Sequence, residues 1–357
     1  MNPTITRLKA LGILLMIIGH SGCSIPQFVP FIYMFHMPLF FIASGMCLKQ
    51  SSLDDPKKFF VKRFKGLYWP FVIWGSAFLL LHSVFASLHL YDDTYTLSTM
   101  ASRAMDIVLH MVDVDNLLGG YWFLSALLTG YVVAWLMLRC FRRLGVNGQF
   151  SIVGGATLII SVLMNCFSDV LTLESTVAKY IPLSFVFFSA RSFEVALYIV
   201  VGYWLSNSGF KPFNNWLIIA SLVLAFVGSY YWRINTGEMF FENSKYLPYL
   251  VTSIFAVWGI YSLLHKFEGY ESRFVKTVDF VGNNTLNFLT WHMLVFRVVS
   301  ALIMWIYALP NIVLSEHPII HEYSAKGWWL VYFVVAVLVC YGISCINKRI
   351  TNSWLKL

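Results

Sequence analysis

Three histidines lie inside strongly apolar stretches of this 357-residue chain, where ionisable side chains are costly and uncommon. His20 follows Lys9 by 11 residues in one such stretch, His36 opens the next, and His292 lies in the later segment NNTLNFLTWHMLVF. Imidazole takes up a proton near neutral pH, so a histidine that faces an internal chamber could serve as a general base. The alternative is structural, because a buried histidine can also hydrogen-bond to a neighbouring helix.

The spacing of Lys9 and His20 places both side chains on one face of a helix. Eleven residues at 100° each leave them about 20° apart around the axis and about 16 Å apart along it. Lys9 would then lie at the cytoplasmic boundary of a bilayer, either as a simple anchor or in a site, with His20 near mid-depth. His292 is also about 11 residues into its own apolar stretch, so the pattern indicates a buried polar chamber if the two helices face one another.

A basic and aromatic segment, DDPKKFFVKRFKGLYWPF, follows the second apolar stretch. Its cations alternate with phenylalanines, which is typical of an amphipathic segment on an anionic membrane surface. Guanidinium and ammonium groups also bind phosphate well, so the segment could instead hold a phosphorylated small molecule. The cations of the segment are Lys57, Lys58, Lys62, Arg63 and Lys65.

Two further patterns concern the packing of helices. Arg191 and Glu194 stand three residues apart in an apolar stretch and can pair, which suits a neutralised structural pair as well as a substrate contact. In FHMPLFFIASG, Pro38 predicts a kink, whereas Ser44 and Gly45 permit a close approach by another helix.

The composition predicts the elements that must position these residues. Hydrophobic residues make up 59% of the chain and charged residues 12%, against about 25% charged in soluble domains. Spanning a bilayer takes about 20 apolar residues in a helix, and the stretches lack the alternation of a membrane barrel. We therefore expect an all-α integral membrane bundle of about ten transmembrane helices, forming one domain over residues 1–357. The stretches are 8–24, 29–48, 67–90, 121–138, 149–167, 181–205, 215–232, 247–264, 281–308 and 327–346.

Charge patterning predicts the orientation of this bundle. With the N-terminus in the cytoplasm, 18 of the 25 lysines and arginines fall on the cytoplasmic side, so we expect both termini there. The first stretch is expected to be a retained helix, and the ninth is long enough to tilt or break. The net charge of +8 does not indicate nucleic acid, because the basic residues fall in short clusters between apolar stretches. The six cysteines show no zinc-ligand spacing, so no metal site is expected.

Taken in order, these motifs resemble those of acyltransferase family 3, in the branch of fucose 4-O-acetylase-like sugar O-acetyltransferases. The resemblance covers the whole ten-stretch layout and rests on Lys9 to His20, His36 to Gly45, the basic segment, YWFLSAL and the His292 segment. Three positions depart from the family pattern. Lys9 stands where arginine is commonest, Thr6 stands where an acid often lies, and Gly66 replaces a second arginine.

The resemblance implies a donor, an acceptor and a location. Members of the family use cytoplasmic acyl-CoA, usually acetyl-CoA, as a co-substrate with no bound cofactor. They acylate a hydroxyl of an envelope glycan or lipid-linked sugar at the bacterial cytoplasmic (inner) membrane. By this resemblance we assign catalysis to His20 and Lys9, with His20 as general base or transient acyl carrier. Acyl-CoA binding falls to Lys62, Arg63 and Lys65, and acceptor binding or orientation to His36, Trp122, His292, Arg191 and Glu194.

Two other functions fit parts of the pattern. A proton-coupled secondary transporter of a sugar or small acid could use His20 and His292 as proton-relay groups. A non-catalytic scaffold or glycan carrier would need neither matched histidines nor the basic segment. Release of CoA that depends on a glycan acceptor would separate the acyltransferase from both.

Overall fold

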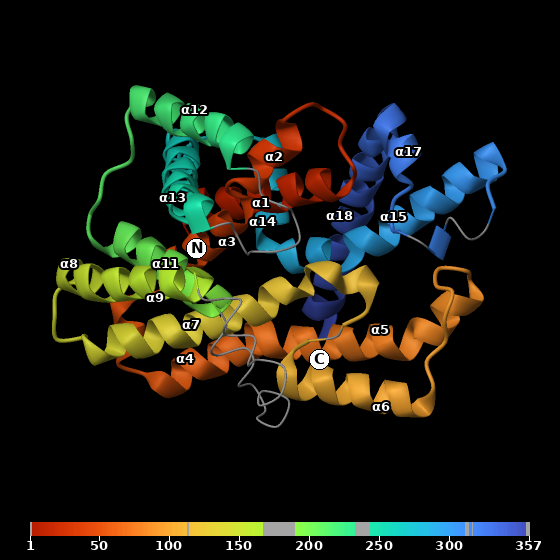
Figure 1. The fold of residues 1–357 in the computed structure, drawn as a ribbon, viewed down its shortest axis with the longest axis horizontal. Coiled ribbons are helices and arrows are strands. Elements are labelled where there is room, and N and C mark those ends of the chain that lie inside the picture. Colours follow the sequence, from red (N-terminus) through yellow and green to blue (C-terminus); the bar gives the residue numbers. More distant parts are fainter. Residues whose placement is uncertain are drawn as a thin grey trace.

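The computed structural model describes residues 2–112, 114–166, 190–232, 243–310, 314–315 and 317–354, and these residues form helices with no β-strand among them. Figure 1 shows the helices packed side by side and across one another. In chain order they are α1 (Pro3–His20), α2 (Phe28–Tyr33), α3 (His36–Met46), α4 (Pro56–Arg63), α5 (Trp69–Ser87), α6 (Leu97–Met105), α7 (Trp122–Cys140), α8 (Val146–Gln149), α9 (Gly155–Cys166), α11 (Ala190–Asn207), α12 (Asn215–Tyr231), α13 (Asn243–His265), α14 (Arg273–Asn283), α15 (Thr285–Tyr307), α17 (His321–Tyr323) and α18 (Trp329–Trp354).

Seven helical stretches of the described chain are long and apolar enough to cross a bilayer, so the protein is a multi-pass membrane protein. Some of them join successive helices through short 3₁₀ or π-helical turns. The seven are Phe28–Met46, Pro56–Ser87, Asn116–Cys140, Val146–Cys166, Ser244–His265, Thr285–Tyr307 and His321–Arg349.

The predicted count of ten is not reached by this criterion. Each predicted stretch overlaps a helix, but α1, α11 and α12 are not among the seven. The helix α12 has only 17 residues, and the two charged side chains in each of α1 and α11 make these helices less apolar than the seven. The predicted stretch 181–205 also begins in residues 181–189, which lie outside the described part of the chain. Ten crossings and two cytoplasmic termini therefore stay predictions.

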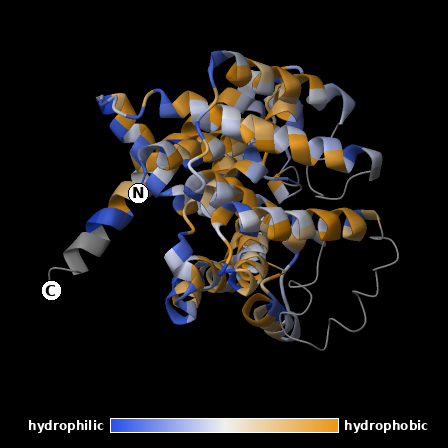
Figure 2. Cartoon of the chain, turned by 90° about the vertical axis from the view of Figure 1, so that its left-hand side faces the viewer, coloured by the Kyte–Doolittle hydropathy of each residue, from blue (hydrophilic) through white to orange (hydrophobic). Residues whose placement is uncertain are grey.

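The exterior of the bundle is apolar along several helices. Leu80 on α5, Trp305 on α15 and Leu338 on α18 expose 69%, 81% and 65% of their surfaces. Figure 2 shows hydrophobic residues along the helices, with hydrophilic residues more frequent at their ends and connections. Such continuous apolar surface is costly in water and suits contact with lipid.

The helix α1 lies between two hydrophobic clusters and contributes to both. Ile5 and Leu8 pack in a cluster built mainly from α3, α7, α11 and α13. Ala10, Ile13 and Ile17 pack in a second cluster built mainly from α5, the start of α7, α15 and α18. The helix that carries Lys9 and His20 is therefore held on both sides by packed side chains.

Two of the predicted stretches are broken within the bundle. The stretch 29–48 forms α2 and α3, and the break falls at Phe35, whose φ of −145° is not helical. Pro38 lies in the first turn of α3, where its missing N–H leaves no helical hydrogen bond to Met34. The predicted kink is thus confirmed, one turn ahead of the proline. The stretch 281–308 breaks at Asn284, between α14 and α15.

Glycines allow α3 and α11 to touch through their backbones. A Cβ atom on Gly45 would collide with the carbonyl of Ile199, and one on Gly202 would collide with the carbonyl of Ile42. Small residues permit this kind of contact between membrane helices. The close approach expected at Gly45 is confirmed.

Candidate functional site: a histidine pair and a cationic region

His20 and His292 meet where α1 passes α15. His20 Nδ1 lies 3.0 Å from His292 Nε2, and the two ring centroids are 5.3 Å apart with planes inclined by 23°. His292 is fully buried, whereas His20 is half-buried. The two histidines do face one another, and His20 is the member that a substrate could reach.

The hydrogen bonds of the pair assign the tautomers of both rings. His292 Nδ1 lies 3.0 Å from the carbonyl oxygens of Phe288 and Leu289. A carbonyl only accepts, so this nitrogen carries the proton, and His292 Nε2 of the neutral ring is an acceptor. His20 Nδ1 must then donate to it. The remaining nitrogen, His20 Nε2, is left unprotonated and can act as a base.

The position of His20 differs from the sequence prediction in one respect. The helix was expected to run to residue 24, but α1 ends at His20 and the N–H of Ser21 closes the last turn on Ile17 and Ile18. Gly22 then has a φ of +72°, which redirects the chain at a position that glycine adopts without strain. The imidazole therefore lies at the end of the helix, next to a turn, and not within a continuing helix.

His36 lies near this pair at the start of α3. It is 6% exposed, its ring centroid is 4.8 Å from that of Tyr33, and its imidazole lies close enough to the backbone of Ile32 for a hydrogen bond. His20 and His36 are also close enough to interact electrostatically. His36 therefore belongs to the same buried group of imidazoles as His20.

A cationic region lies around Cys47, where α3 ends. Arg63 turns inward, with its Cζ 3.6 Å from the centroid of the Tyr131 ring. The hydroxyl of Tyr131 donates to the carbonyl of Ser44 at 2.6 Å. Cys47 interacts electrostatically with both Tyr131 and Lys9. The structure therefore brings Arg63 and Lys9 into one region, although they belong to different helices.

The other two candidate cations of the basic segment lie elsewhere. Lys62 and Lys65 are exposed, whereas Arg63 is half-buried. The helix α4 ends at Arg63 and the chain continues through a π-helical turn over Phe64–Tyr68. Successive side chains of a helix point about 100° apart, so Arg63 can face inward while its neighbours do not. Only Arg63 of the three packs against the bundle interior through its guanidinium.

Arg191 and Glu194 do not form the ion pair that their spacing allows. The guanidinium of Arg191 lies over the Trp122 ring, 4.7 Å from its centroid, and no ion pair joins it to Glu194 within the described residues. Glu194 is 1% exposed and its Oε1 has no hydrogen-bond partner. The buried hydroxyls of Tyr198 and Tyr249 lie close enough to the Glu194 carboxylate to interact with it electrostatically. Arg191 and Glu194 still interact electrostatically, so a structural pair and a substrate contact both stay open for these residues.

His317 is a residue that the sequence reasoning missed. Arg297 donates to the carbonyl of His317 at 2.8 Å, and Ser324 Oγ donates to the carbonyl of Ser21 at 2.6 Å, so this segment packs on the turn after His20. Partial burial, followed by the neighbouring His321, lowers the pKa of the His317 imidazole. The signal that could have found this segment is Arg297, a charged side chain deep in an apolar stretch.

A second buried histidine, His82, was also missed. Its Nδ1 lies 3.1 Å from Asp115 Oδ2, and the hydroxyl of Tyr91 donates to the other oxygen of the same carboxylate. The backbone N–H of Leu117 donates to that oxygen as well, at 2.9 Å. These bonds hold the connection after α5 against the bundle. Burial, together with the negative charge of Asp115, raises the pKa of the Tyr91 hydroxyl.

In the described part of the chain, no three His, Cys, Asp or Glu side chains gather closely enough to hold a metal ion. A family model described as an acyltransferase domain, Acyl_transf_3, matches residues 2–354. No curated protein and no solved structure matches the chain.

Proposed function

The chain belongs to acyltransferase family 3, and from this premise we propose that it is an O-acetyltransferase. It moves an acetyl group from cytoplasmic acetyl-CoA to a hydroxyl of a cell-envelope sugar or polysaccharide. The observation that carries the proposal is the 3.0 Å contact between His20 Nδ1 and His292 Nε2, which leaves His20 Nε2 as a base.

The proposed reaction is a direct transfer with His20 as proton carrier. As the acceptor hydroxyl attacks the thioester carbonyl, His20 Nε2 takes its proton and the new carbon–oxygen bond forms. The carbon–sulfur bond then breaks, and the CoA thiolate receives the proton back from His20. His292 holds His20 in the productive tautomer and spreads the positive charge of the imidazolium that forms.

The cationic region around Cys47 is the proposed entrance for the donor. Arg63 and Lys9 both belong to this region and supply positive charge for the phosphates of acetyl-CoA. Lys62 and Lys65, being exposed, attract the donor to this surface and contribute less once it is bound. In this proposal the region faces the cytoplasm, with both termini on that side.

The acceptor sugar is proposed to meet the pair from the opposite side. The imidazole of His36, which lies near His20, is the proposed hydrogen-bond partner of a sugar hydroxyl. Trp122, Arg191 and Glu194 lie together on α7 and α11 and form a further set of aromatic and charged groups for the sugar. Residues 1–357 act as one domain in the bacterial cytoplasmic membrane.

The test is release of free CoA by the purified protein in detergent, measured with acetyl-CoA and with or without an extracted envelope glycan. The proposal predicts release that depends on the glycan, with one acetyl ester formed for each CoA. Absence of CoA release, together with proton-dependent uptake of sugar by proteoliposomes, would contradict the acetyltransferase proposal and favour a transporter.

A further inference from the structure

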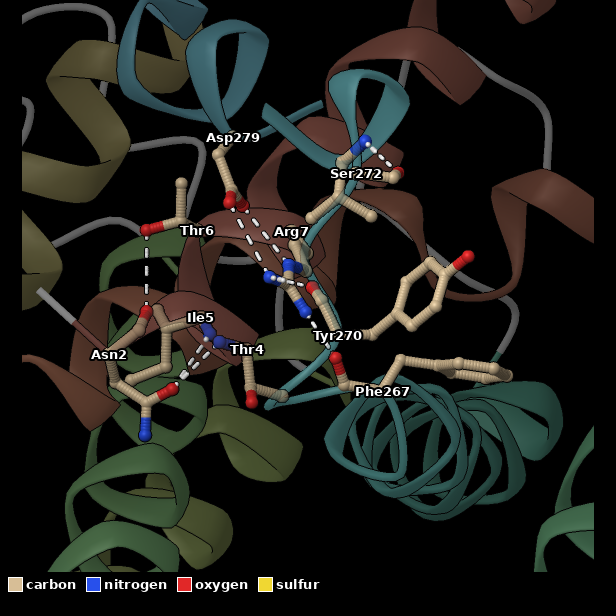
Figure 3. Close-up of polar contacts among 10 residues, drawn as sticks. Asn2, Thr4, Ile5, Thr6, Arg7, Phe267, Tyr270, Ser272 and Asp279 are labelled. Carbon is tan, nitrogen blue, oxygen red and sulfur yellow. Dashed lines mark hydrogen bonds and ion pairs between the residues drawn. The ribbon is translucent and has the colours of Figure 1, made fainter. Parts of the chain in front are cut away.

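Arg7 anchors the first turns of α1 to the region where α13 gives way to α14. Its Nε donates to Asp279 Oδ1 at 3.1 Å and its Nη2 to Asp279 Oδ2 at 3.5 Å. Its Nη1 donates to the carbonyl of Phe267 at 2.5 Å, and its Nη2 to that of Tyr270 at 3.3 Å. Figure 3 shows the guanidinium enclosed by these groups. Arg7 is 8% exposed, so this is a buried, charge-assisted contact and not a surface ion pair.

The Arg7 contact and the histidine contact share one register. Arg7 and Asp279 are 272 residues apart in the chain, and so are His20 and His292. The same 13 residues therefore separate the two contacts along α1 and along the path from α14 into α15. Along the unbroken helix α1 these 13 residues rise by about 20 Å. The other path is interrupted at Asn284, between α14 and α15, so the two contacts are joined by one helix on one side and by two on the other.

The two helices also touch beside the Arg7 contact. A Cβ atom on Gly282 would collide with the carbonyl of Thr6, the residue before Arg7, so α14 and α1 meet there through their backbones. The break at Asn284 then separates α14 from α15 and allows the path to change direction before it reaches His292. Packing alone resists separation of the helices, but apolar surfaces resist sliding weakly. A forked ion pair with fixed geometry resists sliding.

We propose that Arg7 and Asp279 are positioning residues, which hold α1 at the axial register where His20 meets His292. A shift of α1 that moved His20 Nδ1 about 1 Å directly away from His292 Nε2 would stretch the 3.0 Å histidine contact to about 4 Å, beyond the range of a hydrogen bond. The ring of His20 would then be free to take the other tautomer. The catalytic consequence rests on the proposed acetyl transfer, whereas the effect on the histidine contact does not.

The experiment compares two conservative variants with a matched control. Arg7→Lys keeps the charge and loses the fork, and Asp279→Asn keeps the shape and loses the charge. The control, Glu271→Gln, removes the exposed ion pair of Glu271 and Lys276, which also involves α14 but does not join it to α1. Each full-length protein is labelled with ¹⁵N-histidine in lipid nanodiscs, and the His20 signals are assigned by their loss in a His20→Gln variant.

The expected result is a change in the histidine signals without unfolding. The wild-type protein and Glu271→Gln should show His20 protonated at Nδ1 alone, and both positioning variants should show mixed tautomers. With acetyl-CoA and glycan, kcat should fall about 100-fold, the loss expected of a 1 Å misplacement, while KM for acetyl-CoA is unchanged.

Two results would overturn the positioning role. One is an unchanged tautomer and kcat in both variants. The other is a lower melting temperature alone, with wild-type histidine signals and kcat in the folded protein, which would make the contact merely structural. If the tautomers mix in the variants but the wild-type protein transfers no acetyl group, the positioning role stands and the proposed function fails.

Discussion

Replacing His292 with phenylalanine tests whether this residue sets the tautomer of His20. The substitution keeps an aromatic ring in the buried site on α15 and removes the Nε2 acceptor that lies 3.0 Å from His20 Nδ1. The His292 Nδ1–H bonds only to carbonyls of its own helix turn, so no contact to another element is lost with it. The expected effect is a slower transfer step with an unchanged KM for acetyl-CoA.

The size of the effect follows from two terms. Loss of a neutral hydrogen bond costs about 1 kcal/mol, which is roughly fivefold in rate. Without the acceptor, the ring of His20 also populates the tautomer with a proton on Nε2, which cannot accept one from the sugar. General-base catalysis contributes about 10²–10⁴-fold, and this sets the upper bound. We therefore expect kcat to fall by about 10²-fold.

The assay measures acetyl transfer from radiolabelled acetyl-CoA to glycan by the purified protein, under saturating donor. His292→Gln is the matched variant, because its side-chain oxygen can still accept from His20 Nδ1, and it should recover part of the lost rate. A His292→Phe protein that is folded and works within twofold of wild type would refute the tautomer assignment.

Three further changes test other parts of the site and bundle. Arg63→Ala should raise KM for acetyl-CoA about tenfold, since a charged hydrogen bond contributes about 1.5–3 kcal/mol. Lys62→Ala should leave the KM within twofold of wild type. Equal effects of the two substitutions in steady-state kinetics would contradict a distinct inward role for Arg63. Gly45→Ala should destabilise the protein by about 1–3 kcal/mol, because its Cβ has no room against α11, and an unchanged melting temperature would argue against this contact. Arg297→Lys should speed hydrogen exchange in the connection before α17, because lysine cannot hold both carbonyls that the guanidinium binds; unchanged exchange would show that Arg297 does not hold this connection.

The sequence predicts the histidine pair well because the cost of burial singles it out. His20 and His292 are ionisable groups in apolar stretches, and such groups rarely persist without a partner or a task. Their similar depth indicated one chamber, and the structure joins them by a hydrogen bond. The contact itself could not be predicted, since it depends on which helices pack together over 272 residues of chain.

Local breaks in helices account for most of what the sequence could not show. The end of α1 at His20 places the imidazole next to a turn, and the π-helical turn after Arg63 interrupts the segment that carries the cations. Which of Lys62, Arg63 and Lys65 packs inward depends on how this segment lies against Tyr131. Such breaks depend on tertiary contacts more than on local propensity.

The same limit applies to two contacts of charged residues. Spacing alone indicated that Arg191 and Glu194 are neighbours, but it could not indicate that Trp122 from another helix lies under the guanidinium. From the sequence, Arg7 indicates only a basic residue that sets the membrane topology. Nothing near it in the chain indicates that Asp279 is its partner.

The most direct test of the central claim is transfer of a ¹³C-acetyl group in proteoliposomes by wild-type protein and by His20→Ala. Acetyl-CoA is enclosed on one side, the glycan is supplied on the other, and the glycan is analysed by mass spectrometry. We predict a ¹³C-acetyl ester on the glycan with wild-type protein and none with folded His20→Ala protein. A labelled glycan formed at the wild-type rate by His20→Ala would contradict the assignment of His20 as the base.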